Sequence, residues 1–258
     1  MRCEVTKSHL NTIDSGPTKH NVERIITPPV VVLAGGLGTR LRPVTGSLPK
    51  ALASLAPGMP MLRYVLSYWV ARGARRFVLC LGHQATLVEE AIDAWSGSPL
   101  DIDIVTEHEP LGTGGAVLLA LPVLPEEFFV INGDTVIDVS LGAVSRWHHA
   151  GNWDGTVVAS ARTVGDQADG LELSSTGALT AMRGRAERAT WVYAGISLLR
   201  RSLFEGLSLA TPASLEIDVF GQALRAGKRI GGARTRQPFH DLGTPERLLS
   251  FSSRLQDG

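Results

Sequence analysis

Residues 30–40 read Val-Val-Val-Leu-Ala-Gly-Gly-Leu-Gly-Thr-Arg, an apolar, mostly β-branched run that passes directly into a glycine-rich turn. The run at 30–33 is typical of a strand buried on both faces, as strands of parallel sheets are. In an open α/β sheet, ligands bind beyond the carboxyl ends of the strands, where glycine lets successive backbone N–H groups surround phosphate oxygens. The stretch therefore predicts a parallel sheet with a phosphate-binding turn at its edge.

The segments that follow alternate between helix and strand patterns. Apolar residues at helical spacing predict helices, and short apolar runs predict strands. The predicted helices are at 61–70, 87–95 and 114–121, and the predicted strands are at 77–81, 102–105 and 128–131. This alternation is typical of right-handed βαβ units. We therefore expect an α/β fold with one open, mostly parallel, Rossmann-like sheet and helices on both faces.

Beyond Asp138 the pattern becomes looser. Short candidate strands at 156–161, 171–173 and 192–199 are separated by turn signals, from which we expect a small antiparallel lid insertion. Farther on, the spacing of apolar residues predicts an amphipathic helix at 215–224. Thr244-Pro245 reads as the N-cap and first residue of a last helix.

The composition is that of an ordinary globular chain. The 258 residues are 44% apolar and 19% charged, which is enough apolar surface for a sizeable core. Lys+Arg and Asp+Glu number 25 each, so the formal net charge is zero and nothing indicates a global field for nucleic acid or a membrane surface. An anionic ligand must therefore be bound by a local site.

The ends of the chain and its cysteines add further expectations. Residues 1–24 read as a polar N-terminal extension, and a single domain covers 25–258, with no residues left for a second catalytic domain. The apolar runs are far shorter than the roughly 18 residues of a membrane span, and no signal peptide is evident, so we expect a cytoplasmic protein. Cys3 and Cys80 form neither a disulfide framework nor a metal-binding spacing, and we interpret Cys80 as a buried reduced thiol.

Two better-known glycine loops do not fit the turn. A Walker A loop ends in Gly-Lys-Ser/Thr, and no such tripeptide follows. A dinucleotide fingerprint starting at Gly36 and Gly38 needs Gly or Ala where Leu41 stands, and the acidic residue expected about 20 residues later is missing from 56–59. A P-loop and a nicotinamide oxidoreductase are thus disfavoured, while a purely structural turn stays open.

Basic residues close to the turn favour phosphate binding over a structural role. Arg40, Arg42 and Lys50 follow in the same segment. Arg provides a planar fork for phosphate oxygens and Lys a compact charge, which together suit a triphosphate. Taken singly, each of these side chains would be interpreted as a solvated surface charge.

Four motifs follow one another between residues 33 and 246. They are Leu33-Ala34-Gly35-Gly36-Leu37-Gly38-Thr39-Arg40-Leu41-Arg42-Pro43-Val44-Thr45 with Pro49-Lys50, Glu109-Pro110-Leu111-Gly112-Thr113-Gly114-Gly115, Asn132-Gly133-Asp134-Thr135, and Asp241-Leu242-Gly243-Thr244-Pro245-Glu246. In this order they resemble the motifs of the sugar-1-phosphate nucleotidyltransferases. The combination of the two middle motifs looks closest to D-glycero-D-manno-heptose 1-phosphate guanylyltransferases.

The resemblance implies a nucleotide site and a Mg²⁺ site. It implies that the nucleotide is bound by Leu33, Ala34, Gly35, Gly36, Gly38, Thr39, Arg40, Lys50, Gly82, Glu109, Thr113 and Gly114. Arg40 and Lys50 would contact its phosphates, and Asp134 and Asp241 would hold the Mg²⁺ cofactor; these four are the implied catalytic residues. Asp134 follows the predicted strand 128–131, where a carboxylate can face bound phosphates, and Mg²⁺ takes carboxylate oxygens alongside such phosphates.

The implied reaction is in-line attack by a sugar 1-phosphate oxygen on the α-phosphorus of a nucleoside triphosphate, with release of pyrophosphate. The sugar phosphate is itself the nucleophile, so no Ser, Cys or His nucleophile is needed. Catalysis would rest on positioning and charge neutralisation. We accordingly interpret His83, His148 and His149 as structural or solvated.

The resemblance is less complete for the base and the sugar. Glu109 is a candidate acceptor for the N–H groups of guanine, which favours GTP while UTP stays open. The implied sugar-phosphate residues are Gly170, Arg185, Gly195 and Glu216. Here the chain departs from the family, because Gly184-Arg185 stands where Glu-Lys is usual and Tyr193 stands where Asn is common. Arg185 would then replace the missing lysine.

The expected activity is therefore Mg²⁺-dependent guanylyl transfer from GTP to D-glycero-D-manno-heptose 1-phosphate, in the biosynthesis of the sugar nucleotide GDP-heptose. Within the same class, uridylyltransferases for MurNAc or glucose 1-phosphate and mannose-1-phosphate guanylyltransferases are alternatives. From another class, a non-catalytic regulatory subunit could bind sugar nucleotides. The expected partners are the triphosphate and the sugar phosphate, with no nucleic acid and no membrane, and the oligomeric state, a homo-oligomer included, stays open.

Overall fold

The predicted strand at 30–33 is β2 (Val30–Leu33), and it lies inside a sheet of ten strands. It pairs in parallel with β5 (Arg76–Leu81) on one side and with β7 (Glu127–Asn132) on the other. Strand β5 pairs in turn with β6 (Asp101–Thr106), again in parallel. The carboxyl ends of these four strands therefore meet at one edge, as the alternation of strands and helices predicts.

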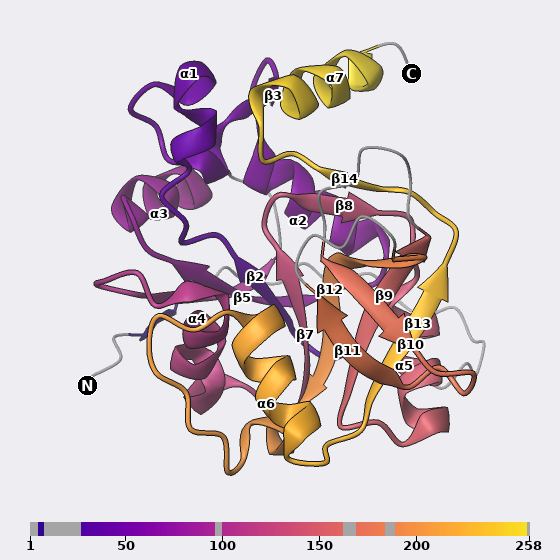
Figure 1. Ribbon diagram of the computed structural model, residues 1–258. Helices are drawn as coiled ribbons and strands as arrows, with labels where there is room; N and C mark the ends of the chain where they lie inside the picture. The colour runs from indigo at the N-terminus through magenta and orange to yellow at the C-terminus, as the bar shows by residue number, and fades with distance from the viewer. Residues whose placement is uncertain (1–4, 8–26, 96–99, 162–168, 184–188, 257–258) are drawn as a thin grey trace, which may run out of the picture.

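The computed structural model in Figure 1 describes residues 5–7, 27–95, 100–161, 169–183 and 189–256. Arg185, the predicted sugar-phosphate residue, lies outside the described residues, as does most of the N-terminal extension. Residues 5–7 of that extension form β1 (Val5–Lys7), which pairs antiparallel with β6. None of the helices in these ranges is both long and apolar enough to cross a membrane.

The sheet continues beyond β7 with antiparallel pairing. Strand β12 (Trp191–Arg200) lies antiparallel to β7 and, on its other side, to β9 (Gly155–Ala161). Strand β13 (Ile230–Thr235) then pairs in parallel with β9. The result is a mixed sheet with a parallel half, formed by β6, β5, β2 and β7, and an antiparallel half around β12.

The lid insertion is smaller than the sequence pattern suggests. Residues 192–199 of β12 are all buried, so this strand belongs inside the sheet and not in an exposed flap. The lid is therefore reduced to the hairpin of β10 (Gly170–Leu173) and β11 (Leu179–Arg183). In this hairpin, Gly170 and Leu171 of β10 pair with β12.

Helices cover both faces of the sheet, as predicted. Val30 and Val32 of β2 point into one core and Val31 into the other, because side chains alternate along a strand. The first core is covered by α2 (Met61–Ala71), α3 (Ala85–Ala94), α5 (Leu141–Gly151) and α7 (Pro245–Gln256), and the second by α4 (Gly112–Ala120) and α6 (Phe220–Arg225). Figure 1 shows α4 and α6 together on one side of the sheet.

The remaining elements are short. They are the strands β3 (Ser54–Ala56), β4 (Met59–Pro60), β8 (Thr135–Ile137) and β14 (Phe239–Asp241), the helix α1 (Arg42–Thr45), the 3₁₀ helices η1 (Thr39–Leu41), η2 (Lys50–Leu52), η3 (Leu121–Val123) and η4 (Arg201–Phe204), and the π-helix η5 (Leu215–Val219). The predicted helix at 215–224 is thus a π-helical turn that continues into α6. The predicted helices at 61–70, 87–95 and 114–121 correspond to α2, α3 and α4, and the last helix starts at Pro245 as expected.

Candidate active site

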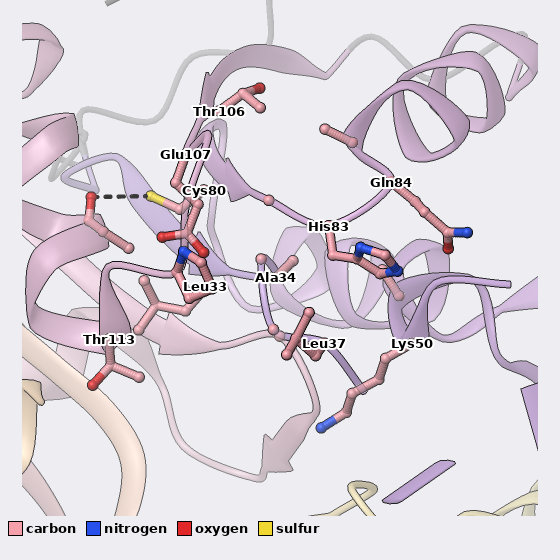
Figure 2. A pocket seen from close by; sticks show the side chains of 18 of the residues that line it. Leu33, Ala34, Leu37, Lys50, Cys80, His83, Gln84, Thr106, Glu107 and Thr113 are labelled. Atoms are coloured by element: carbon pink, nitrogen blue, oxygen red, sulfur yellow. Dashed lines mark hydrogen bonds between the residues drawn. The ribbon is translucent and has the colours of Figure 1, made fainter. Parts of the chain in front are cut away.

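A cavity of about 920 Å³ opens at the carboxyl ends of the four parallel strands. Leu33, Cys80, Thr106 and Asn132, from the ends of β2, β5, β6 and β7, all line it. Figure 2 shows the side chains that face it. The cavity therefore lies where the sequence pattern predicts a ligand.

Most of the implied nucleotide-binding residues line this cavity. Those in its wall are Leu33, Ala34, Gly35, Gly36, Lys50, Gly82, Glu109 and Thr113. The structure does not bring Gly38, Thr39, Arg40 and Gly114 into that wall. Arg40 is exposed on η1, next to the glycine turn, and Gly114 is buried on α4 against Ser214 and Val219.

Gly38 brings Lys50 to the cavity. Its backbone is left-handed, with φ of 60°, and a Cβ at this position would lie 2.7 Å from the Cβ of Lys50. Only glycine adopts this conformation readily and leaves room for such an approach. The glycine turn and the Pro49-Lys50 segment therefore pack together, and Lys50 lines the cavity.

Glu107 lies where the glycine turn meets the loop after β5, and the sequence analysis did not single it out. A Cβ on Gly35 would lie 2.9 Å from Glu107 Oε1, and one on Gly82 would lie 2.8 Å from it. The other oxygen, Oε2, accepts the backbone N–H of Leu111 at 3.1 Å. Burial raises the pKa of Glu107. By contrast, Glu109 is exposed at the cavity's rim.

Glu107 and Lys50 lie at different ends of the cavity. Figure 2 shows Ala34 and Leu37 between these two side chains. The Glu107 end offers a partly buried carboxylate oxygen, whereas the Lys50 end offers a cation and the backbone of the glycine turn. Such an arrangement suits a ligand with hydrogen-bond donors at one end and phosphates at the other.

Glu216 is tied to the cavity wall through Thr113. Its Oε2 accepts hydrogen bonds from Thr113 Oγ1 at 3.0 Å and from Ser214 Oγ at 2.8 Å. The N–H of Leu215 donates to Thr113 Oγ1 at 2.8 Å. The start of η5 is therefore fastened to the start of α4, although Glu216, Gly170 and Gly195, the implied sugar residues that the structure describes, are not part of the wall itself.

The other described sugar-side glycines belong to the antiparallel half. Gly195, with φ of 69°, interrupts the regular pairing of β12 with β9, and a Cβ there would lie 2.8 Å from Asn132 Nδ2 in the cavity wall. Gly170 starts β10, opposite Val192 of β12. Tyr193 is buried, which raises its pKa, and its hydroxyl lies 3.2 Å from Ser197 Oγ. Gly195 therefore borders Asn132 on the β12 side of β7, opposite the strand β2 that leads into the glycine turn.

A small two-stranded ribbon brings Asp134 and Asp241 together. Strands β8 and β14 pair antiparallel with Asp241 opposite Thr135. The backbone N–H of Leu242 donates to the carbonyl of Asp134 at 2.8 Å. Two carboxylates that are far apart in the sequence thus lie side by side, and Asp134 also lines the cavity.

Each of these carboxylates contacts a cation. Lys50 Nζ forms an ion pair with Asp134 Oδ2, and both side chains are 19% exposed. Arg247 forms an ion pair with Asp241 Oδ2. The four side chains together carry no net charge, so a metal ion and a polyanion can enter as a pair without leaving a large excess of either sign.

The carboxylates suit a metal that takes most of its ligands from elsewhere. Among the described residues, no group of three or more His, Cys, Asp or Glu side chains could hold a metal ion. A Cβ on Gly243, however, would lie 2.8 Å from Asp241 Oδ1, 3.1 Å from Asp134 Oδ2 and 3.2 Å from Lys50 Nζ. Glycine keeps this meeting point of polar atoms open. Mg²⁺ fits such a site, because it binds one or two carboxylates together with substrate phosphates.

The histidines differ from one another in position. His148 is fully buried, its Nδ1 lies 2.8 Å from Thr156 Oγ1, and burial lowers its pKa to about 4. His149 pairs with Glu127 at 2.7 Å. Neither lines the cavity, in keeping with structural roles, whereas His83 is part of the cavity wall. Cys80 is buried in the same wall, with Sγ 3.6 Å from the Ala116 carbonyl.

The fold and the motifs define a family. The family model described as "Nucleotidyl transferase" matches residues 29–258, so the chain belongs to the nucleotidyl transferase family. That span includes the glycine turn and the whole cavity wall.

Among relatives with assigned activities, a mannose-1-phosphate guanylyltransferase of Mycobacterium tuberculosis is 31% identical over 234 residues, which are 88% of this chain and 64% of that protein. A D-glycero-alpha-D-manno-heptose 1-phosphate guanylyltransferase of Aneurinibacillus thermoaerophilus is 28% identical over 88% of this chain and 97% of that protein. The chain thus spans less than two thirds of the first of these relatives.

A similar fold is found in the crystal structure of HddC from Yersinia pseudotuberculosis. It has a TM-score of 0.78 and 25% sequence identity, and covers 88% of this chain and 99% of that one. HddC has also been solved in complex with GMP-PN, with a TM-score of 0.76. The single α/β architecture is thus that of known nucleotidyltransferases.

Proposed function

We propose that this chain transfers a guanylyl group from GTP to a sugar 1-phosphate in a Mg²⁺-dependent reaction that releases pyrophosphate. The observation that carries the proposal is the convergence of Lys50, Asp134 and Asp241 around Gly243, next to the glycine turn. This is the arrangement that phosphoryl chemistry needs: a cation and two carboxylates that meet beside a cavity of about 920 Å³.

In this reaction the protein supplies positions and charge. The N–H groups of the glycine turn and Lys50 would bind the triphosphate, and the exposed Arg40 on η1, next to the turn, would contact its phosphates. Mg²⁺, held by Asp134 and Asp241, would neutralise the charge that develops on the phosphates. The sugar phosphate oxygen attacks the α-phosphorus, the bond to the β-phosphate oxygen breaks, and pyrophosphate leaves.

For the base, we propose Glu107 as the acceptor for guanine. Its Oε1 faces the cavity between Gly35 and Gly82, and its position is set by the hydrogen bond from Leu111 to Oε2. Guanine presents two adjacent N–H donors on one edge, which a carboxylate can accept. The exposed Glu109 was the sequence-based candidate for this role. The HddC complex with GMP-PN and the guanylyltransferase relatives support a guanine nucleotide.

For the sugar, we favour D-glycero-D-manno-heptose 1-phosphate over mannose 1-phosphate. The two similar middle motifs and the relative from Aneurinibacillus thermoaerophilus support the heptose. Glu216, Gly195 and Gly170 would border the sugar on the antiparallel side of Asn132. The assignment of Arg185 to the sugar phosphate stays a prediction.

The test is a screen for pyrophosphate release from GTP, UTP, CTP, ATP and dTTP, each paired with heptose, mannose, glucose and MurNAc 1-phosphates in the presence of Mg²⁺. We expect the highest kcat/KM for GTP with the heptose. Release only with UTP would overturn the guanine assignment, and a preference for mannose 1-phosphate would overturn the heptose. No release from any pair, with tight binding of a sugar nucleotide by calorimetry, would instead identify a regulatory subunit.

A further inference from the structure

Arg247 contacts Asp241, but it belongs to none of the four motifs and does not line the cavity. It lies in the first turn of α7, and its guanidinium contacts Asp241 Oδ2. The other carboxylate oxygen, Oδ1, accepts the backbone N–H of Gly243 at 2.8 Å. Two donors, one on each oxygen, thus restrain the rotation of the Asp241 carboxylate.

The position of Arg247 is itself held by packing. The chain turns at Gly243, and Arg247 N–H approaches Thr244 Oγ1 at 3.5 Å where the helix begins. Farther along α7, Leu248 is 1% exposed and Phe251 is 7% exposed, and the ring of Phe251 lies 5.5 Å from that of Tyr64. Because the helix is anchored in the core, the guanidinium returns to Asp241 from a rigid element.

Lys50 and Arg247 differ in what they face. Lys50 lines the cavity and would exchange part of its contact with Asp134 for the phosphates of a bound nucleotide. Arg247 is not part of the cavity wall, so a ligand can enter the cavity without contacting its guanidinium. A carboxylate has about four acceptor positions, and two donors leave the others free for a metal ion.

We propose that Arg247 is a positioning residue that holds the Asp241 carboxylate in the orientation in which it binds the metal ion. The inference rests on the proposed metal site and adds the group that orients one of its ligands. Hydrogen-bonding partners behind metal ligands typically contribute 10- to 100-fold to metal affinity, and we expect a loss of that size when Arg247 is removed.

The experiment measures metal dependence without turnover. The Kd of α,β-methylene GTP, whose α–β bridge cannot be cleaved, is determined by calorimetry in Mn²⁺ and again in EDTA, and the ratio gives the contribution of the metal. The variants are Arg247→Ala, Arg247→Lys, Asp241→Asn and the control Arg254→Ala. Arg254 lies on the same helix, contacts only Ser250 among the described hydrogen bonds and carries the same charge.

We expect Arg247→Ala to lower the Mn²⁺ contribution about 10- to 100-fold, Arg247→Lys to restore most of it, and Arg254→Ala to leave it unchanged. In steady-state assays, Arg247→Ala should raise the metal concentration needed for half-maximal rate and leave kcat at saturating metal close to wild type. If the Mn²⁺ contribution is unchanged or larger in Arg247→Ala but is lost in Asp241→Asn, the proposed role of Arg247 is wrong and the proposed metal site stands. No Mn²⁺ contribution in the wild type would overturn the metal site as well.

Discussion

The parallel and antiparallel halves of the sheet contribute differently to the candidate site. In the parallel half, β2, β5, β6 and β7 all end at the cavity, so each loop that follows a strand faces it. In the antiparallel half, β12 runs past the same edge in the opposite direction, and Gly195 approaches Asn132 from the middle of the strand.

The difference follows from strand direction. Successive parallel strands place the residues after each strand at one edge, so motif order along the chain predicts the site. Neighbouring antiparallel strands end at opposite edges of the sheet. Which of their residues lie near the cavity therefore depends on strand register and on irregularities such as the register shift between Tyr193 and Ser197. The proposed nucleotide side can therefore be recognised in the sequence more readily than the proposed sugar side.

The largest effect should come from the carboxylates that join the two halves. Asp134 follows β7 of the parallel half, whereas Asp241 ends β14 near the C-terminus. We expect Asp134→Asn and Asp241→Asn each to lower kcat by about a thousandfold or more, because a metal ion supplies several kcal/mol of transition-state stabilisation. Pyrophosphate release at saturating substrates and Mg²⁺ measures this.

The matched control is Asp138→Asn, four residues after Asp134. Asp138 pairs with Arg72 at 2.8 Å and its side chain is 69% exposed, so its removal should change kcat less than about twofold. If Asp241→Asn kept a near-normal rate while Asp134→Asn did not, the metal would be held by the parallel half alone.

A smaller effect should be seen in the pH dependence of stability, through His148, which lies on α5 and contacts Thr156 of β9 in the antiparallel half. Burial lowers its pKa from 6.5 to about 4, so between these values the unfolded chain binds more protons than the folded one. The stabilisation is complete above pH 6.5 and is lost as the pH falls toward 4. Between pH 7 and pH 5 we expect the free energy of unfolding to fall by about 2 kcal/mol from this group.

Urea unfolding of the wild type and of His148→Gln at both pH values measures the contribution of His148. Between pH 7 and pH 5, the free energy of unfolding of the variant should fall by about 2 kcal/mol less than that of the wild type. Equal losses in both proteins would show that His148 is solvated in the folded chain or that the antiparallel half opens before the transition.

The smallest effect concerns the base in the parallel half. In Glu107→Gln, an amide N–H₂ would replace one carboxylate oxygen, and one hydrogen bond to a charged group contributes roughly 1.5 kcal/mol. We expect KM for GTP to rise about tenfold and the preference for GTP over UTP to fall by a similar factor. The same measurements on Glu109→Gln should be near wild type. If Glu109→Gln instead changes these values and Glu107→Gln does not, Glu109 contacts the base.

Most of the parallel half could be predicted because its signals are local. The apolar run at 30–33 and the helical spacing at 61–70 depend only on neighbouring residues, and the structure confirms both elements. The burial of β12 could not be read in the same way, since strands in a lid and strands in a sheet share one alternating pattern. Its position depends on pairing with β7, which is distant in the sequence.

The sequence by itself determined the family motifs, the parallel sheet and the edge of the sheet at which the cavity lies, because each of these depends on contiguous residues. Only the tertiary structure decided which distant side chains meet. It placed Asp241 beside Asp134 through the β8–β14 ribbon, turned Arg247 back onto Asp241, and set Glu107 instead of Glu109 against the glycine turn. Such contacts depend on strand register and helix packing, which no single segment of the chain specifies.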